Sequence, residues 1–435
     1  MKHFLKNHSF INGAANIEQN AQSSATLDST AFDNGSSYCK KLDRRSFLKK
    51  SVAATIGATL MPLPMKAFAR EPELKIGYIP ITDATPLLIA HSLGFFRDEG
   101  LKVQRPVMIR SWTVLTESFI GGKFNLTHML FPIPVWMRFS RNIPVKVLAW
   151  DHTNGSAVTV HGESGIRGFG DLGGKQIAVP SWYSMHNFIL QMGIMAKGLT
   201  PVIRPQDAEL KSDEVNLFVL PPSEMPPALL GRKMDGFIVA EPFNALAEMK
   251  LNARIMRFTG DIWKNHPCCV LVSHEQLLKE QPVFIQKAVN AVVRAQLWCT
   301  KNPERAAHIL SREGDGYLPV HEEVLLRVFT GYDDKKYLEG PKPRPIMHPE
   351  WQTGRIGFQP YPYPSATRFI IEQMARTKVE GDTDFIRAID PVRGAGLLVD
   401  DTFVKKAMQE MRVHGTFGSE EDFTSFAREE VIEIG

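Results

Sequence analysis

The chain from residue 75 onward alternates short apolar segments with segments of helical apolar spacing, and this alternation constrains the fold most strongly. Residues 75–79 predict a strand, which ends at Pro80. A polar turn at residues 82–85 leads into a helix that ends at Gly94. Because strands and helices follow one another in repeated order, we expect an α/β fold with largely parallel sheets.

The same order recurs along the rest of the chain, whose 435 residues are enough for two or three domains. Further strands are expected at residues 101–109, 125–130, 143–150, 157–160, 176–179, 215–220, 235–239 and 270–273. Further helices are expected at residues 112–120, 136–139, 186–196, 225–230, 281–299, 302–310, 319–329, 364–375 and 400–411, with residues 132–134 as a proline-rich interruption.

Two lobes are expected from this order. Residues 152–160 are interpreted as a crossover, and the strand at residues 270–273 as the return to the first lobe. The first lobe would therefore comprise residues 73–160 with residues 268–435, and the second lobe residues 162–265. Polar turns at the carboxyl ends of parallel strands, beside helix N-termini, suit a small polar ligand.

The N-terminal 69 residues are predicted to be a leader. A polar segment without periodicity, expected to be disordered, precedes the pair Arg44-Arg45, and an apolar run at residues 51–63 follows. The run is shorter than the ~20 residues of a spanning helix. This arrangement resembles a twin-arginine export signal that is cleaved after Ala69. A basic amphipathic N-terminus or an uncleaved anchor is the alternative. The signal implies transient binding to the twin-arginine translocase and a freely soluble periplasmic protein, because no lipobox cysteine precedes the cleavage site.

The basic excess belongs to this leader. It contains nine Lys/Arg and four Asp/Glu, so the remainder of the chain carries a charge of about −1 out of the total of +4. The charge therefore does not favour nucleic acid as a partner.

The four cysteines are Cys39, Cys268, Cys269 and Cys299. Adjacent cysteines do not easily form a disulfide with each other, so we expect buried free thiols, with a bridge to Cys299 as the alternative. No Cys-x-x-Cys spacing is present, and no metal or other cofactor is expected.

Several ordered motifs between residues 73 and 411 resemble the solute-binding proteins of nitrate, bicarbonate, sulfonate and taurine ABC importers. They are Ile76-Gly77-Tyr78, Gly94-Phe95-Phe96, Asp171-Leu172-Gly173-Gly174-Lys175, Asp235-Gly236-Phe237 and Glu241-Pro242-Phe243. Ser111-Trp112 and residues 260–267 and 358–367 are similar to the nitrate- and bicarbonate-binding branch. The resemblance implies a two-lobed periplasmic binding protein of type II (a Venus flytrap) without catalytic residues. It also implies a monomer that delivers a small molecule or anion to a membrane permease and its ATPase.

The resemblance and the strand ends together suggest seven ligand-binding residues. Trp112 and His186 resemble the family's pocket tryptophan and ligand-contacting histidine, and Ser156 aligns where nitrate binders usually carry Gln. The other four lie at strand ends: Thr82, Asp83, Thr85 and Glu241. Because a carboxylate repels an anion, Asp83 is expected mainly as a helix cap. The ligand class is a small oxyanion or a nitrogen or sulfur compound, with nitrate as the leading candidate.

One departure from the family pattern leaves other functions open. Cys268-Cys269 stands where nitrate binders carry a charged pair after the His-Pro motif. Enzymes of the same fold, namely pyrimidine-precursor synthases of thiamin biosynthesis and sulfinate-cleaving hydrolases, rely on Cys and His, and His266 is nearby in the sequence. A periplasmic sensory module is a third possibility. We expect a binding protein rather than an enzyme.

Overall fold

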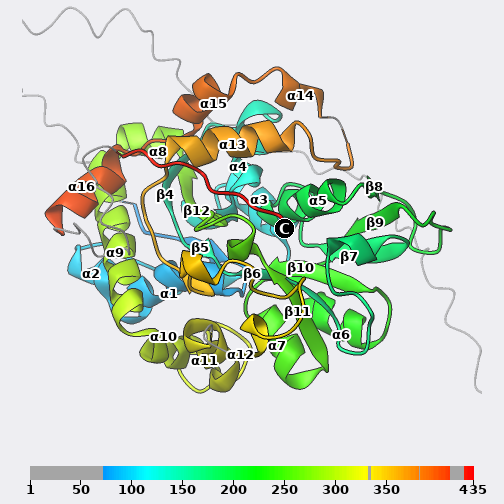
Figure 1. Ribbon diagram of the computed structural model, residues 1–435. Helices are drawn as coiled ribbons and strands as arrows, with labels where there is room; N and C mark the ends of the chain where they lie inside the picture. The colour runs from blue at the N-terminus through cyan, green and yellow to red at the C-terminus, as the bar shows by residue number, and fades with distance from the viewer. Residues whose placement is uncertain (1–71, 332–334, 382, 412–425) are drawn as a thin grey trace, which may run out of the picture. The chain divides into compact units, whose positions relative to one another are not determined.

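The computed structural model describes residues 72–331, 335–381, 383–411 and 426–435 (Figure 1). The predicted leader lies outside these residues, so the export signal and its cleavage after Ala69 stay predictions. In the described part of the chain, no helix is both long and apolar enough to cross a membrane.

The first sheet has five strands. Their order is β2 (Val107–Met108), β1 (Ile76–Tyr78), β3 (Leu126–Leu130), β12 (Cys269–His274) and β4 (Val145–Trp150). β2, β1 and β3 are parallel, whereas β12 runs antiparallel to both β3 and β4. The predicted strand at residues 270–273 is present as part of β12, which enters the first sheet at its interior, between β3 and β4.

The second sheet has six strands. Their order is β11 (Ala253–Phe258), β6 (Ser156–His161), β10 (Gly236–Ala240), β7 (Lys175–Val179), β9 (Glu214–Val219) and β8 (Thr200–Val202). β10, β7, β9 and β8 are parallel, and β6 is antiparallel to its two neighbours. We expected residues up to 160 in the first lobe, but β6 joins the second sheet because its backbone pairs with β10 and β11. The division into lobes stays a prediction.

Helices cover these sheets (Figure 1), and those at residues 95–98, 243–250, 275–280, 335–338, 384–387 and 391–398 were not predicted. In all, the described residues form sixteen helices. They are α1 (Thr85–Ser92), α2 (Phe95–Asp98), α3 (Trp112–Ile120), α4 (Pro132–Phe139), α5 (Met185–Ala196), α6 (Met225–Leu230), α7 (Phe243–Lys250), α8 (Glu275–Glu280), α9 (Pro282–Lys301), α10 (Pro303–Leu310), α11 (Glu322–Thr330), α12 (Lys335–Leu338), α13 (Pro364–Met374), α14 (Asp384–Arg387), α15 (Pro391–Leu398) and α16 (Thr402–Glu410). The long helix α9 buries its apolar face, which includes Phe284, Ile285 and Val292, and packs against α1 and α16.

Two local predictions were wrong. Residues 132–134 do not interrupt the helix but form its first turn, because a proline at the first helical position loses no hydrogen bond. Residues 101–109 form only the short strand β2, and its two residues are exposed. This strand lies at the edge of the sheet, where one side of the ladder has no partner strand.

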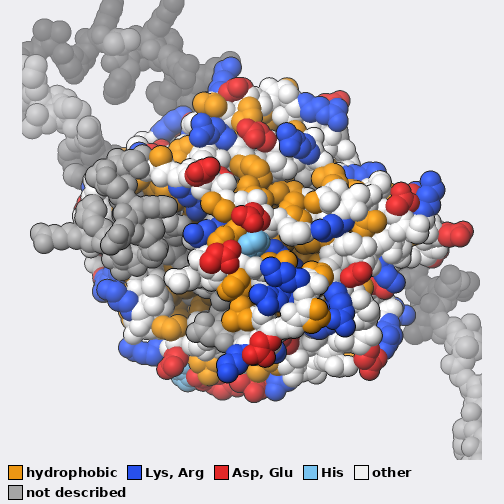
Figure 2. Space-filling view, viewed as in Figure 1, with side chains coloured by type: hydrophobic (Ala, Val, Ile, Leu, Met, Phe, Trp, Pro, Cys, Tyr) orange, Lys and Arg blue, Asp and Glu red, His pale blue; other side chains and the backbone are white. Residues whose placement is uncertain are grey.

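The connections between the two sheets are held by distant parts of the chain. β5 (Thr153–Asn154) follows β4 and pairs with β13 (Ile356–Gly357). The other connection runs from β11 to β12. In it, the backbone of Trp263 pairs with Ile432 of the C-terminal segment, and the Trp263 indole N–H donates to Glu430 over 2.8 Å. On the face that Figure 2 shows, acidic and basic side chains are interspersed, in keeping with the small net charge.

Candidate functional site

The seven predicted ligand-binding residues are all buried, and they lie at strand ends, in the turns that follow or in the first turn of the next helix: Thr82, Asp83, Thr85, Trp112, Ser156, His186 and Glu241. They come from both sheets. The segments after β1, β2, β7 and β10 contribute six of them, and Ser156 begins β6. The carboxyl ends of parallel strands are where open α/β sheets bind ligands.

The turn after β1 is bonded to the second sheet. The backbone N–H and the hydroxyl of Thr82 both donate to the carbonyl of Glu241, over 2.8 and 3.1 Å. Thr85 donates its hydroxyl back to the carbonyl of Thr82 over 2.6 Å. These two hydroxyl protons are therefore engaged within the protein, and the turn links β1 to β10.

Asp83 does not cap a helix, contrary to our expectation. Neither the 3-10 turn η1 (Thr82–Ala84) nor α1 has a side-chain cap. The Asp83 carboxylate points inward, where Oδ2 lies 2.9 Å from His152 Nε2 and accepts from Cys269 Sγ over 3.0 Å. Burial raises the pKa of Asp83, and the interaction with His152 only partly opposes this effect. Burial alone would lower the pKa of His152, but interactions led by the Asp83 carboxylate hold it well above its usual value.

A second group joins Ser156, His186 and Cys268. Ser156 Oγ lies 2.8 Å from His186 Nε2, and Cys268 Sγ lies 3.8 Å from that hydroxyl and 4.0 Å from that nitrogen. His186 stands in the first turn of α5, which Ser184 caps by accepting from the Asn187 N–H. Burial raises the pKa of Cys268, but contacts with Cys269 and the neighbouring histidines outweigh burial and hold it well below its usual value.

Glu241 serves another part of the protein. Its Oε1 accepts from Arg355 Nε over 2.7 Å, and its Oε2 accepts from the Ala245 N–H over 3.0 Å. Both oxygens are therefore engaged by the chain, and a ligand-binding role for Glu241 stays a prediction.

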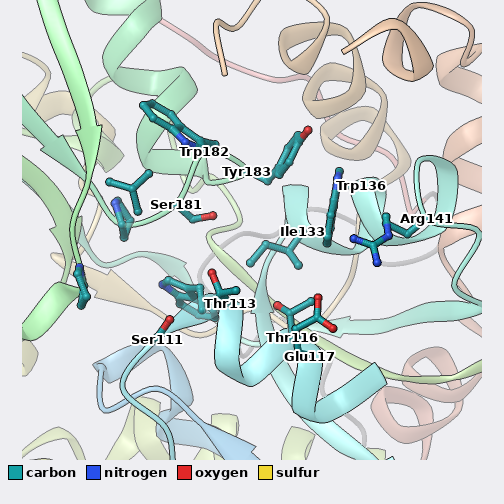
Figure 3. A pocket seen from close by; sticks show the side chains of 14 residues that line it. Ser111, Thr113, Thr116, Glu117, Ile133, Trp136, Arg141, Ser181, Trp182 and Tyr183 are labelled. Carbon is teal, nitrogen blue, oxygen red and sulfur yellow. The ribbon is translucent and has the colours of Figure 1, made fainter. Parts of the chain in front are cut away.

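Trp112 lines a cavity of about 450 Å³, which Figure 3 shows from close by. Residues of α3 and α4 form one wall, and residues 180–183, after β7, form the other. Trp136 and Tyr183 stack across it with ring centroids 5.5 Å apart. The other lining residues are Ser111, Thr113, Thr116, Glu117, Ile133, Arg141, Pro180, Ser181, Trp182, Val219 and Pro221. The cavity thus combines aromatic walls with hydroxyl groups and one charge of each sign.

Trp112 also faces the buried groups. Its ring lies 5.4 Å from that of His128, which accepts from the Ile79 N–H over 3.0 Å. Burial lowers the pKa of His128 to about 3, so its imidazole is neutral at ordinary pH. Among the described atoms, the side-chain Trp112 Nε1 and His186 Nδ1 are buried without a hydrogen-bond partner.

Sequence reasoning missed His128 and His152. His152 follows the predicted strand at residues 143–150, so the rule for strand ends could have identified it, but we interpreted it as part of a crossover. Nothing in the local sequence marks His128, which lies within β3. The cysteine prediction is confirmed, because Cys268, Cys269 and Cys299 are buried free thiols.

Comparison with known proteins places these observations in a family. Residues 68–312 match the sequence model of the NMT1-like family. The chain is 28% identical over 259 residues to the nitrate/nitrite binding protein NrtA of Nostoc sp. strain PCC 7120, covering 54% of this chain and 56% of that protein. It is 24% identical over 338 residues to the nitrate import ATP-binding protein NrtC of Synechocystis sp. strain PCC 6803, covering 74% of this chain and 48% of that protein. The chain thus spans about half the length of these curated relatives.

A solved structure is similar over most of the chain. The crystal structure of the periplasmic nitrate-binding protein NrtA from Synechocystis PCC 6803 superposes with a TM-score of 0.65 at 20% sequence identity. The match covers 83% of this chain and 94% of the other. It confirms the expected fold, that of the two-lobed periplasmic binding proteins, with mixed, parallel-rich sheets.

Proposed function

This chain belongs to the NMT1-like family, and from that premise we propose that it is the solute-binding component of an ABC importer. It captures a small solute in the periplasm and delivers it to a membrane permease that an ATPase drives. The similarity to a nitrate import ATP-binding protein supports a nitrate-type importer as the partner. We further propose that it works as a monomer after export by the twin-arginine pathway.

The observation that carries this proposal is the convergence of strand ends from both sheets on one place. The turn after β1 is bonded to the end of β10 through Thr82 and Glu241, and Ser156 of β6 is bonded to His186 of α5. A solute between the sheets would touch both, which is how hinge closure can report occupancy. Of the seven predicted residues, Trp112 alone lines the cavity between α3, α4 and the turn after β7.

The proposed ligand is a small oxyanion, with nitrate first. Trp112 Nε1 and His186 Nδ1 are buried nitrogens without a partner among the described residues, and an N–H at either position can donate to an anionic oxygen. Planar nitrate also suits aromatic walls. Asp83 lies 2.9 Å from His152, so a protonated imidazole can offset its negative charge.

A binding role is favoured over thiol catalysis. Cys268 lies close enough to His186 to be activated, but its side chain is fully buried. Reactive cysteines are typically partly exposed.

Isothermal titration of the full chain with nitrate, nitrite, bicarbonate, taurine and alkanesulfonates tests the proposal. We expect saturable binding of one of the oxyanions without any change in the ligand, measured by ion chromatography after incubation. Conversion of the bound compound into a product would refute the role of a binding protein. His186→Ala should weaken the binding, whereas His308→Ala, at an exposed ion pair, should not. Equal affinity of the His186 variant and the wild type would show that the pocket is assigned wrongly.

A further inference from the structure

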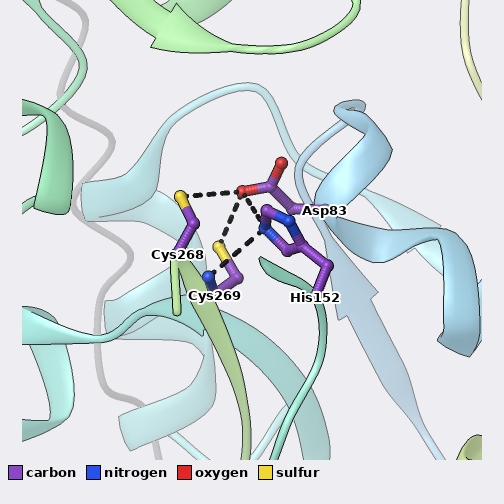
Figure 4. Close-up of side chains that lie close together, drawn as sticks. All are labelled: Asp83, His152, Cys268 and Cys269. Carbon is purple, nitrogen blue, oxygen red and sulfur yellow. Dashed lines mark hydrogen bonds and ion pairs between the residues drawn. The ribbon is translucent and has the colours of Figure 1, made fainter. Parts of the chain in front are cut away.

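Four buried side chains bring together donor atoms of the kind that hold metal ions. They are Asp83, His152, Cys268 and Cys269, and one ligand atom from each lies within 4.8 Å of all the others. Figure 4 shows that the imidazole and both thiols converge on the same carboxylate oxygen. All four side chains are fully buried.

The first sheet positions these residues through three of its strands. Asp83 follows β1, His152 follows β4, and Cys269 begins β12 directly after Cys268. Because β12 is antiparallel to its neighbours, its first residues lie at the carboxyl ends of β3 and β4, where Cys269 pairs with Leu130 and Val270 with Trp150. Three of the ligands therefore stand at or next to strand ends and Asp83 stands in the turn after β1, and positions anchored by a sheet hold side chains more rigidly than free loops do.

The buried carboxylates at this site have acceptor oxygens that the described residues do not satisfy. Asp83 Oδ1 is buried without a hydrogen-bond partner among the described atoms, and so are both carboxylate oxygens of the neighbouring Asp151. His152 and the thiols contact Oδ2 of Asp83, but a buried carboxylate oxygen without a partner still costs free energy unless it is protonated or binds a metal. The unpartnered oxygen is thus an independent sign that the site accommodates positive charge.

We propose that Asp83, His152, Cys268 and Cys269 bind one divalent cation of the zinc class. Zinc prefers four ligands drawn from thiolate, imidazole and carboxylate, arranged as a tetrahedron. With zinc–sulfur distances of ~2.3 Å and zinc–nitrogen distances of ~2.0–2.1 Å, such ligand atoms lie roughly 3.3–3.8 Å apart. The distances from Asp83 Oδ2 are 2.9 Å to His152 Nε2, 3.0 Å to Cys269 Sγ and 3.5 Å to Cys268 Sγ. These three distances would therefore lengthen by about 0.5 Å or less. Every pair of ligand atoms lies within 4.8 Å, so none of the remaining pairs would have to shorten by more than about 1 Å.

The ligand set also selects the metal. Two thiolates and an imidazole disfavour calcium and magnesium, which take oxygen ligands. Binding releases the protons that the coordinating thiols and imidazole carry, because the metal coordinates thiolates and neutral imidazole. No motif in the sequence indicated this site, since its ligands come from three distant segments. The site shares Asp83 with the proposed ligand-binding residues, but its test measures the bound metal and not the solute.

Cobalt substitution of the full chain tests the site. All measurements use a Cys39→Ser background, so that no thiol outside the described residues contributes. Metals are first removed with a chelator under reducing conditions. We expect Co²⁺ to bind once per chain with a sulfur-to-cobalt charge-transfer band and visible bands of tetrahedral intensity. Zn²⁺ should displace it stoichiometrically and raise the melting temperature.

Ligand variants give the decisive comparison. Cys268→Ser and Cys269→Ser should each reduce cobalt affinity by more than the roughly 10–100-fold that follows loss of an outer-sphere partner. Cys299→Ser is the matched control, because Cys299 is a buried free thiol outside the cluster, and it should keep the band. His152→Gln and Asp83→Asn repeat the test without removing a thiol, and melting of the metal-free variants reports whether each one folds. A cobalt spectrum without sulfur charge transfer, or one unchanged in the folded cysteine variants, would overturn the proposal.

Discussion

The guanidinium of Arg355 and the carboxylate of Glu241 form a buried ion pair, with Nη2 and Oε1 2.6 Å apart, although 114 residues separate them in the sequence. Glu241 stands at the end of β10, and Arg355 immediately precedes β13, which pairs with β5. The backbone carbonyl of Glu241 also accepts from the turn after β1. This ion pair therefore ties the second sheet to a segment that packs against a connection between the sheets.

Removal of the cation from this pair should destabilise the protein strongly. Arg355→Met leaves the Glu241 carboxylate buried without its partner, and loss of one partner of a buried pair typically costs ~3–5 kcal/mol. Urea unfolding measures the loss. Arg232→Met is the control, because Arg232 pairs with Glu163 at the exposed surface and such pairs contribute ~0–1 kcal/mol. Similar losses in both variants would contradict the structural role of Arg355.

Trp112→Phe should weaken binding of the oxyanion ligand. The substitution keeps an aromatic ring in the cavity wall but removes the unpartnered indole N–H. A hydrogen bond to a charged group contributes ~1.5–3 kcal/mol, which corresponds to a roughly 10–100-fold loss of affinity. Titration calorimetry with nitrate measures it. Trp298→Phe, in α9 and outside the cavity, should bind as the wild type does, and an unaffected Trp112 variant would exclude this indole as a donor to the ligand.

Gly77→Ala should destabilise the first sheet. A Cβ at Gly77, in β1, would overlap the ring of Phe124 and press on Leu115, both of which are buried. Overpacking of this kind typically costs ~1–3 kcal/mol. Gly396→Ala is the matched control, because Gly396 lies in α15 with open space around it and should gain ~0.5–1 kcal/mol. Thermal and urea unfolding of the two variants should therefore shift in opposite directions.

The ion pairs of Glu275 should contribute stability that depends on pH. Hydrogen bonds from Lys279 and Arg138, both over 2.9 Å, lower the pKa of Glu275 to about 2. Because the folded pKa lies below the unfolded value of ~4.3, this contribution is complete above that value and is lost as the pH falls towards 2. The difference in urea midpoint between the wild type and Glu275→Gln should therefore be constant from pH 6 to 7 and shrink at pH 3.5. A difference that did not change with pH would contradict this assignment.

Export should depend on the two arginines of the leader, which lie outside the described residues. Replacement of Arg44 and Arg45 by lysine should keep the protein in the cytoplasm, because the twin-arginine pathway reads the arginine pair. Cell fractionation measures this, and mass spectrometry of the exported wild type should find an N-terminus at Arg70. The double variant Lys49→Arg/Lys50→Arg is the control, because it exchanges the same two residue types without a change in charge and should be exported normally. Normal export of the Arg44/Arg45 variant would contradict the prediction of a twin-arginine signal.

The arrangement of strands and helices was largely predictable, because it depends on local patterns. The apolar spacing of residues 281–299 indicated α9 with nearly its observed bounds. The prolines at residues 132–134 misled us, because a proline is compatible with a helix start as well as with a break. Likewise, the periodicity of residues 157–160 indicated a strand but not the sheet to which it belongs, since sheet membership depends on backbone pairing with distant strands.

Sequence alone determined the fold class and the candidate positions at strand ends, because apolar spacing and turn chemistry act over a few residues. What those side chains do follows from the tertiary structure. It placed Asp83, expected as a cap, against His152 and Cys269, and it engaged Glu241 with Arg355. Asp83 and Cys269 are 186 residues apart in the sequence. Their contact depends on the insertion of an antiparallel β12 between β3 and β4, a long-range pairing that no local pattern encodes.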